Sequence, residues 1–159
     1  MAFTNNVTRL LDGKHVAYTI HTYPYSADLH AATDVADAIG FPQEQVFKTL
    51  VALNVAPGHK PTLVMVPGNE TLDLKRLARA LGVKKMQMAT RSTAERLTGL
   101  LAGGISPLAL INRGFAIYLD SRASNFERIY ISAGQRGVQV GIGVADLVKL
   151  TRARLLSLV

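Results

Sequence analysis

The chain has 159 residues, of which 48% are hydrophobic and 18% charged, and its formal net charge is +7. These values are typical of a folded globular protein and exclude an intrinsically disordered chain. The chain contains no cysteine, which excludes disulfides, thiolate metal sites and a cysteine nucleophile of its own.

The excess of positive charge favours a polyanionic partner or an anionic substrate. The N-terminal residues Met1–Asn6 lack a basic region followed by an apolar run, and no stretch approaches the roughly 20 apolar residues that would span a bilayer. We therefore expect a cytoplasmic protein with no membrane partner. The length predicts a single domain over residues 1–159.

Hydrophobic periodicity and helix-ending residues predict a mixture of short helices and strands in the first half of the chain. The predicted elements are a helix ended by Gly13, a strand over 16–21, a loop over 26–30, a helix ended by Gly40, and strands over 46–55 and 62–66. Thr33 is the expected N-cap of the second helix. Pro57-Gly58 separates the last two strands, which predicts an antiparallel hairpin.

The clearest helix is expected between its cap, Asp73, and Gly82, because apolar residues line one of its faces. Ser92 and Glu95 have the spacing of a capping box for a helix that ends at Gly99. The other predicted elements are strands over 85–89, 115–120, 128–132 and 138–142, a helix over 144–150, and a final helix over 152–158 capped by Thr151. This order predicts an α+β fold with a mixed, largely antiparallel sheet flanked by helices.

The stretch Gly103-Gly104-Ile105-Ser106-Pro107 has the composition of a ligand-binding loop. Adjacent glycines allow torsions and close approaches that other residues do not, and Pro107 restricts Ser106. Such a loop can direct backbone N–H groups at a phosphate or an oxyanion. A plain turn between a helix and a strand would use the same residues, so the loop by itself leaves both interpretations open.

Lys48 is a cation in a predicted strand that is apolar on both faces and therefore central in a sheet. Its ammonium must reach water at an edge, pair with an acid, or line a cleft where it meets a negative charge of a ligand. Burial would lower its pKa, which also allows a role in proton transfer.

The stretch Ser132-Ala133-Gly134-Gln135-Arg136-Gly137 can present amides, a hydroxyl and a guanidinium to a ligand, or can form a simple hairpin turn. Tyr23 and Tyr25 flank Pro24, where they could stack on a nucleobase or cover an edge of the core. Basic residues dominate the segment 72–97, which resembles a phosphate-binding surface or a merely solvated one. The candidate phosphate contacts there are Lys75, Arg76 and Arg79.

Several site classes are disfavoured. The four histidines, His15, His21, His30 and His59, are scattered, so we expect no metal site. Ser106 lacks the second glycine of a nucleophile elbow, and no His and Asp can be assigned to it. The glycine loop matches neither a Walker nor a dinucleotide-binding pattern, and we expect no cofactor.

Three motifs together resemble the YbaK/EbsC family, the free-standing relatives of the editing domain of bacterial prolyl-tRNA synthetases. They are Val46-Phe47-Lys48-Thr49-Leu50, Gly103-Gly104-Ile105-Ser106-Pro107-Leu108 and Ser132-Ala133-Gly134-Gln135-Arg136-Gly137. The likeness extends from the first helix to the last and is greatest to the Cys-tRNA(Pro) deacylases. It implies the editing-domain fold and cleavage of the ester that joins an amino acid to the 3′ end of a mischarged tRNA, with prolyl-tRNA synthetase as a further partner.

The resemblance also implies the roles of individual residues. Lys48 would contact the terminal adenosine or its phosphate, and Gly103 and Gly104 would face the aminoacyl carbonyl. The other implied substrate-binding residues are Tyr23, Phe47, Thr49, Ile105, Ser106, Pro107, Ser132, Gly134, Arg136 and Gly137. The chain differs from the cysteine branch at Gln139, where an aspartate is common, and near 29–31, which lacks the usual phenylalanine.

The resemblance requires no protein nucleophile, because in the cysteine branch the thiol of the substrate is the attacking group. Cys-tRNA(Pro) is the expected substrate, with Cys-tRNA(Cys) a second. A deacylase for Ala-tRNA(Pro) or another mischarged tRNA is an alternative, which needs a water and a general base that the sequence does not reveal. A non-catalytic module that binds tRNA or the synthetase is a further alternative, as is a basic nucleic-acid-binding domain without an acyl pocket.

Overall fold

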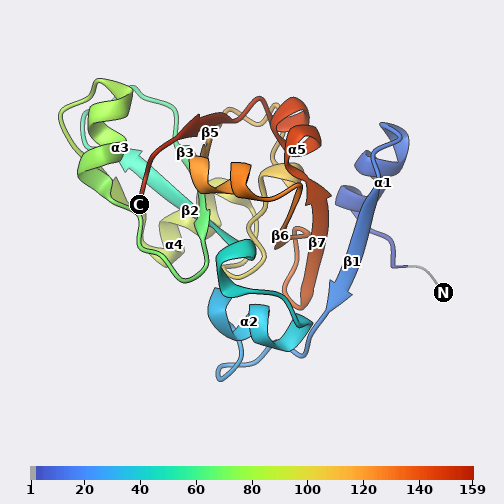
Figure 1. The fold of residues 1–159 in the computed structure, drawn as a ribbon. Coiled ribbons are helices and arrows are strands. Elements are labelled where there is room, and N and C mark those ends of the chain that lie inside the picture. Colours follow the sequence, from blue (N-terminus) through green and yellow to red (C-terminus); the bar gives the residue numbers. More distant parts are fainter. Residues whose placement is uncertain (1–2) are drawn as a thin grey trace.

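The computed structural model describes residues 3–159; Met1 and Ala2, the start of the segment considered above for a leader, lie outside the described residues. The helices surround two β-sheets (Figure 1). The elements are α1 (Asn6–Gly13), β1 (Tyr18–Thr22), α2 (Ala32–Ile39), β2 (Phe47–Asn54), β3 (Thr62–Pro67), α3 (Leu74–Leu81), β4 (Met86–Met88), α4 (Arg91–Thr98), β5 (Ala116–Asp120), β6 (Arg128–Ser132), β7 (Val138–Gly143), α5 (Val144–Thr151) and β8 (Arg154–Leu156). Short 3-10 helices are η1 (Gln43–Gln45), η2 (Pro107–Ala109) and η3 (Ser121–Asn125).

The predicted α+β fold is confirmed, with its strands divided between two sheets. One sheet has the order β1-β7-β6 and is antiparallel throughout. The other has the order β4-β2-β3-β5-β8, in which β4, β2 and β3 are antiparallel and β3, β5 and β8 are parallel. The predicted hairpin of β2 and β3 is confirmed, with Lys48 opposite Val66.

Side chains of both sheets form one main hydrophobic cluster. Phe47, Val51 and Leu119 of the larger sheet join Ile131 and Val140 of the smaller one in it. A second cluster lies where α3 meets the larger sheet and includes Val64, Leu77 and Leu158. The larger sheet is therefore covered on both faces, which explains why β2 and β3 are apolar on both.

The predicted final helix over 152–158 is wrong. Arg152 has a left-handed backbone, with φ of 57°, and ends α5, after which β8 pairs in parallel with β5. Thr151 is the last residue of α5, and its hydroxyl donates to the carbonyl of Leu147 at 2.7 Å. Leu158 is fully buried, and its amide donates to Oδ2 of Asp120 at 2.8 Å. Strand pairing and burial of Leu158 therefore outweigh the local helical pattern, because tertiary contacts override weak propensities.

Two predicted caps are also wrong. Helix α2 begins after Ala31, which makes no side-chain cap, and Thr33 lies inside the helix. The N-cap of α4 is Thr90 rather than Ser92. Glu95 does not close a capping box, since its carboxylate instead accepts a hydrogen bond from the amide of Ala102 at 2.7 Å. That bond joins α4 to Ala102, the residue before the glycine loop.

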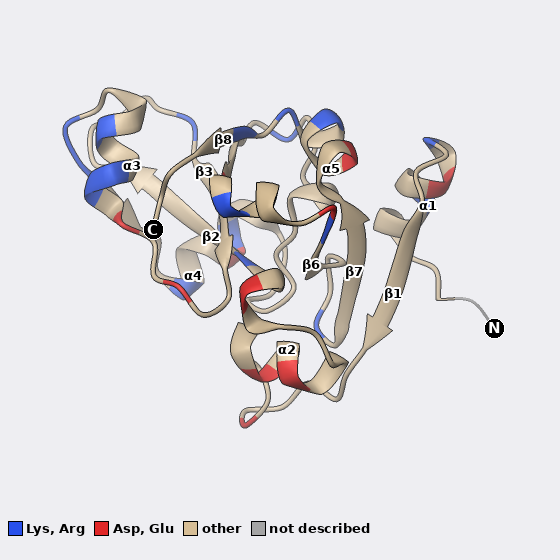
Figure 2. Ribbon diagram, viewed as in Figure 1, with Lys and Arg blue, Asp and Glu red and all other residues tan. Residues whose placement is uncertain are grey.

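Charge is unevenly distributed over the fold. Lysines and arginines gather on α3 and near β8 and α5, whereas α2 carries acidic residues (Figure 2). The sequence has no lysine or arginine between Lys14 and Lys48. Among residues 3–159, no helix combines the length and apolar character needed to cross a bilayer.

The buried C-terminal segment generates a stability prediction. Leu158→Ala should lower the free energy of unfolding by about 2–5 kcal/mol, because it leaves a cavity in place of a fully buried side chain. Leu155→Ala is the matched control and should change it by less than about 1 kcal/mol, since Leu155 is 43% exposed. Chemical denaturation of both variants checks this, and equal losses would contradict the burial of Leu158.

Candidate active site

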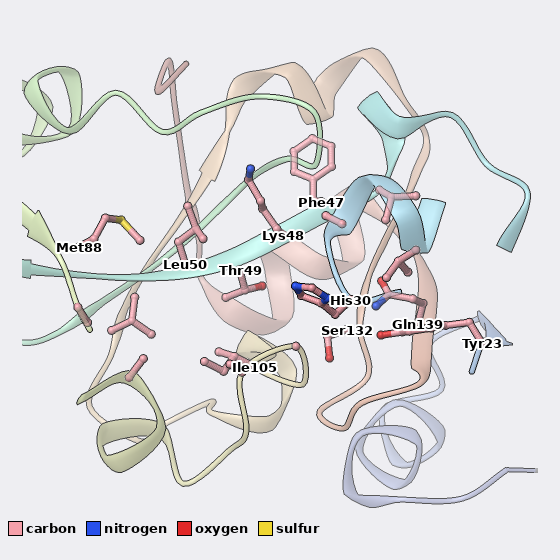
Figure 3. A pocket seen from close by; sticks show the side chains of 18 residues that line it. Tyr23, His30, Phe47, Lys48, Thr49, Leu50, Met88, Ile105, Ser132 and Gln139 are labelled. Carbon is pink, nitrogen blue, oxygen red and sulfur yellow. The ribbon is translucent and has the colours of Figure 1, made fainter. Parts of the chain in front are cut away.

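The candidate site lies along the part of β2 that has no pairing with β4. Strand β3 pairs with β2 from Phe47 to Ala52, but β4 is short and pairs only with Ala52–Asn54 on the other edge. The first half of β2 is therefore not covered by β4. A pocket of about 290 Å³ opens there, between β2, the loop after β1, the glycine loop and strands β6 and β7 (Figure 3).

The pocket brings together part of the predicted site. The predicted residues that line it are Tyr23, Phe47, Lys48, Thr49, Gly103, Ile105 and Ser132. The predicted residues that do not line it, but belong to the loops behind its wall, are Gly104, Ser106, Pro107, Gly134, Arg136 and Gly137. Lys75, Arg76 and Arg79 are exposed on α3, away from the pocket.

Lys48 is half-buried at the pocket without forming a salt bridge to any described residue. Its ammonium donates a long hydrogen bond of 3.4 Å to the carbonyl of Gly68. Burial lowers the pKa of Lys48 below its usual value, and the charge of Glu70 opposes this. Glu70 itself is paired with Arg122 at 2.6 Å. Lys48 therefore offers a positive charge that the described residues leave without a direct carboxylate partner.

The glycine loop is positioned by the turn that joins β6 to β7. A Cβ atom on Gly104 would lie 2.9 Å from Cα of Gln135 and 3.0 Å from the amide nitrogen of Arg136, so only glycine allows the two backbones to approach this closely. Ala102 is held from both sides: its amide donates to Glu95, and its carbonyl accepts from Nε of Arg136 at 2.8 Å. The loop is thus fixed before any ligand binds.

The backbone amides of the loop have different partners. The amide of Gly104 donates to the carbonyl of Leu101 at 2.8 Å. Residues 3–159 provide no hydrogen-bond acceptor for the amides of Gly103 and Ile105, and both of these residues line the pocket. Gly103 and Ile105 are therefore pocket-lining residues whose N–H groups have no acceptor among the described residues.

The β6–β7 turn supports the pocket from behind. The amide of Tyr23 donates to the carbonyl of Gly137 at 2.9 Å, which ties the loop after β1 to this turn. The guanidinium of Arg136 lies over the ring of Tyr25, 4.6 Å from its centroid, and a Cβ atom on Gly103 would lie 3.0 Å from this ring. Arg136 and Gly137 thus connect the walls of the pocket to one another.

Sequence reasoning missed several lining residues, of which His30 and Gln139 are polar. His30 is exposed at the pocket, and its spacing from the other histidines in the sequence gives no sign of a site. Gln139 does carry a signal in the sequence, because it is a polar residue within an apolar strand, as Lys48 is. Met88 and Leu50 contribute apolar side chains to the pocket wall, and Leu50 lies between Met88 and Lys48 (Figure 3).

Buried polar atoms without a hydrogen-bond partner gather at this site. Among the described residues they are Thr49 Oγ1, Arg136 Nη2 and Gln139 Oε1. Thr49 and Gln139 line the pocket, and Arg136 holds its glycine loop. Such atoms are rare in native proteins and often mark a place where a ligand or water supplies the missing partner. No group of three or more potential metal-ligating side chains occurs among residues 3–159.

Comparisons with known proteins agree on one family. Residues 26–150 match the model of the aminoacyl-tRNA editing domain. The chain is 34% identical to EbsC of Enterococcus faecalis, named as a candidate Cys-tRNA(Pro)/Cys-tRNA(Cys) deacylase, over 94% of this chain and 89% of EbsC. It is also 31% identical to part of the proline–tRNA ligase of Shouchella clausii, over 69% of this chain and 19% of the ligase.

A solved structure is similar over nearly the whole fold. It is the crystal structure of a candidate trans-editing enzyme for prolyl-tRNA synthetase, with a TM-score of 0.78 and 24% sequence identity. The match covers 99% of this chain and 98% of that one. The editing-domain fold that the motifs imply is thereby confirmed.

The close approach at Gly104 generates a second prediction. Gly104→Ala should destabilise the protein by about 1–3 kcal/mol, because its Cβ would press on the backbone of Gln135 and Arg136. Gly13→Ala is the control, since a Cβ there meets no atom within 4 Å. Thermal denaturation of both variants measures the difference. An unchanged melting temperature for Gly104→Ala would show that the two loops separate at little cost.

Proposed function

Because this chain belongs to the aminoacyl-tRNA editing domain family, we propose that it is a deacylase that acts in trans on mischarged tRNA. It cleaves the ester between an amino acid and the 3′-terminal ribose, with Cys-tRNA(Pro) and Cys-tRNA(Cys) as substrates. The similarity to EbsC, which bears the name of a deacylase of this specificity, supports this choice of amino acid. Lys48 and the glycine loop are the groups that we assign to the reaction.

The observation that carries the proposal is that Lys48, Gly103 and Ile105 all line one pocket. The 3′ end of tRNA is anionic at its phosphates, and Lys48 lies at this pocket without a salt bridge to any described residue. The ester carbonyl develops negative charge when attacked, and Gly103 and Ile105 line the pocket with amides that have no acceptor among residues 3–159. Positioned donors of this kind stabilise an oxyanion because they need no reorganisation during the reaction.

The chain contains no cysteine, and Ser106 is fully buried with its Oγ accepting from the amide of Leu108 at 3.2 Å. For a cysteinyl ester the substrate can supply the nucleophile. Its sulfur bonds to its own carbonyl carbon, the bond from that carbon to the 3′ oxygen breaks, and the thiol proton passes to the departing tRNA hydroxyl. The product is a cyclic thioester. Binding therefore contributes mainly by holding thiol and carbonyl in reacting geometry.

A second candidate is hydrolysis of Ala-tRNA(Pro) or another ester that lacks a thiol. The observation that favours it is the imidazole of His30 at the pocket. The ring nitrogen of a neutral imidazole can accept a proton from an attacking water. The choice between the two candidates is thus a choice between a nucleophile from the substrate and one from solvent.

The rest of the tRNA would contact the basic surface outside the pocket. Lys75 and Arg79 are exposed on α3 and available for phosphates, whereas Arg76 already donates to the carbonyl of Val159 at 2.9 Å. Phosphate contacts of this kind do not distinguish sequences. Discrimination among tRNAs would then depend on an associated prolyl-tRNA synthetase. We place this activity in one domain and in the cytoplasm, as the sequence predicts.

The decisive measurement is the release of labelled amino acid from tRNA(Pro) charged separately with cysteine, alanine or proline. Wild-type protein should release cysteine, and Lys48→Ala should lower kcat/KM by roughly 100-fold or more, because it removes the charge that holds the tRNA end. Lys14→Ala, which changes an exposed lysine outside the pocket, serves as the control.

Release of alanine in place of cysteine would move the specificity to the second candidate. In that case His30→Ala should abolish the reaction. If wild-type protein binds charged tRNA but releases no amino acid, the molecule is a binding module. Equal binding of charged and uncharged tRNA would instead indicate a nucleic-acid-binding domain without an acyl pocket.

A further inference from the structure

We propose that Thr49 and Gln139 together bind the α-amino group of the aminoacyl ester, so that the protein accepts only esters whose amino group is free. This inference rests on the proposed function, because that function places the ester in the pocket. It extends the function by defining the substrate class as aminoacyl esters and excluding N-acylated ones.

Gln139 is the stronger of the two observations. It lies on β7, the central strand of the smaller sheet, and is 5% exposed. Its Oε1 has no hydrogen-bond partner among the described residues, yet the residue lines the pocket. A buried amide oxygen without a donor is unfavourable, because it has lost its water without a replacement. A ligand that brings a donor would remove this deficit.

Thr49 presents a second acceptor to the same pocket. Its Oγ1 is also buried and has no partner among residues 3–159. Lys48 and Thr49 extend to opposite sides of β2, and Thr49 lies on the side that faces Ser132, Gln139 and Tyr23 (Figure 3). The pocket is therefore divided by the edge of β2 into a cationic side and a side with two unpaired acceptors.

The number of acceptors favours an amino group over the other donors of the substrate. A ribose hydroxyl or a thiol has one hydrogen to donate, whereas an amino group has two or three and can satisfy both oxygens at once. None of the described residues that line the pocket is an aspartate or a glutamate, so the amide and hydroxyl oxygens are the acceptors available to an amino group there.

The position of the acceptors also agrees with this assignment. Gly103 and Ile105, whose amides are assigned to the ester carbonyl, line the same pocket as Thr49 and Gln139. The α-amino group of an aminoacyl ester is separated from its carbonyl carbon by one carbon atom. A carbonyl held by the glycine loop therefore brings the amino group near the side of β2 that carries Thr49. An N-acyl group there would remove donors and add bulk.

The first test measures binding without turnover. The probes are 3′-cysteinylamido-3′-deoxyadenosine, in which an amide replaces the labile ester, and its N-acetyl derivative, both titrated by calorimetry. Wild-type protein should bind the free-amino compound roughly 10- to 100-fold more tightly, as expected when a buried acceptor loses its donor. Equal affinities for the two compounds would overturn the proposal.

The second test compares variants in the same titration and in deacylation. Gln139→Leu and Thr49→Val should each weaken binding of the free-amino compound by roughly 10-fold or more, with no further loss for the N-acetyl compound. Gln139→Glu retains an acceptor and should keep the preference for a free amino group. Gln87→Leu is the matched control, because Gln87 is exposed on β4 and does not line the pocket.

The outcomes separate this inference from the proposed function. If the wild-type protein cleaves no charged tRNA, the proposed function fails, but the titrations still decide the binding of the amino group. If Gln139→Leu weakens both compounds equally, or Gln139→Glu loses the preference as Gln139→Leu does, Gln139 is not an acceptor for the amino group and the proposal is wrong. Thermal denaturation of each variant confirms that it folds.

Discussion

The structure of the site depends on the contact between two backbone segments at Gly104. The glycine loop and the β6–β7 turn approach until the Gly104 Cα faces the backbone of Gln135 and Arg136, with no space for a Cβ atom. Hydrogen bonds from both directions to Ala102 hold the loop in place. Because the same turn contacts Tyr23 through Gly137, one backbone contact sets the relative position of several walls of the pocket.

Strand β2 contributes a second constraint. It is central in its sheet, but β4 pairs with only part of its length. Its pairing with β3 and its buried Phe47 and Val51 anchor it in the main hydrophobic cluster. The brevity of β4 leaves the first half of this strand open to the pocket. A rigid strand can therefore carry Lys48 and Thr49 to the surface without a flexible loop, which favours precise positioning of a substrate.

Several polar groups of the site lack the hydrogen bonds that would stabilise the folded protein. Lys48 has only a long bond to Gly68, and the oxygens of Thr49 and Gln139 have no partner among the described residues. Elsewhere among residues 3–159, buried side-chain nitrogen and oxygen atoms have hydrogen-bond partners, as with Asp120, which accepts from the amides of Arg122 and Leu158. Concentration of unsatisfied groups at one pocket is expected where a ligand completes the hydrogen bonding.

The sequence by itself determined the fold class, the hairpin of β2 and β3, and the three motifs that identify the family, because these depend on residue type and order along the chain. It could not determine that the C-terminal segment forms β8, since the pairing partner in β5 is distant in sequence. Nor could it show that Gly104 faces a backbone while Gly103 and Ile105 face the pocket. His30 and Gln139 joined the site only through folding, because each lies on a different loop or strand from Lys48. Tertiary structure decided these points, since proximity across a pocket is set by how the two sheets pack and not by any local pattern.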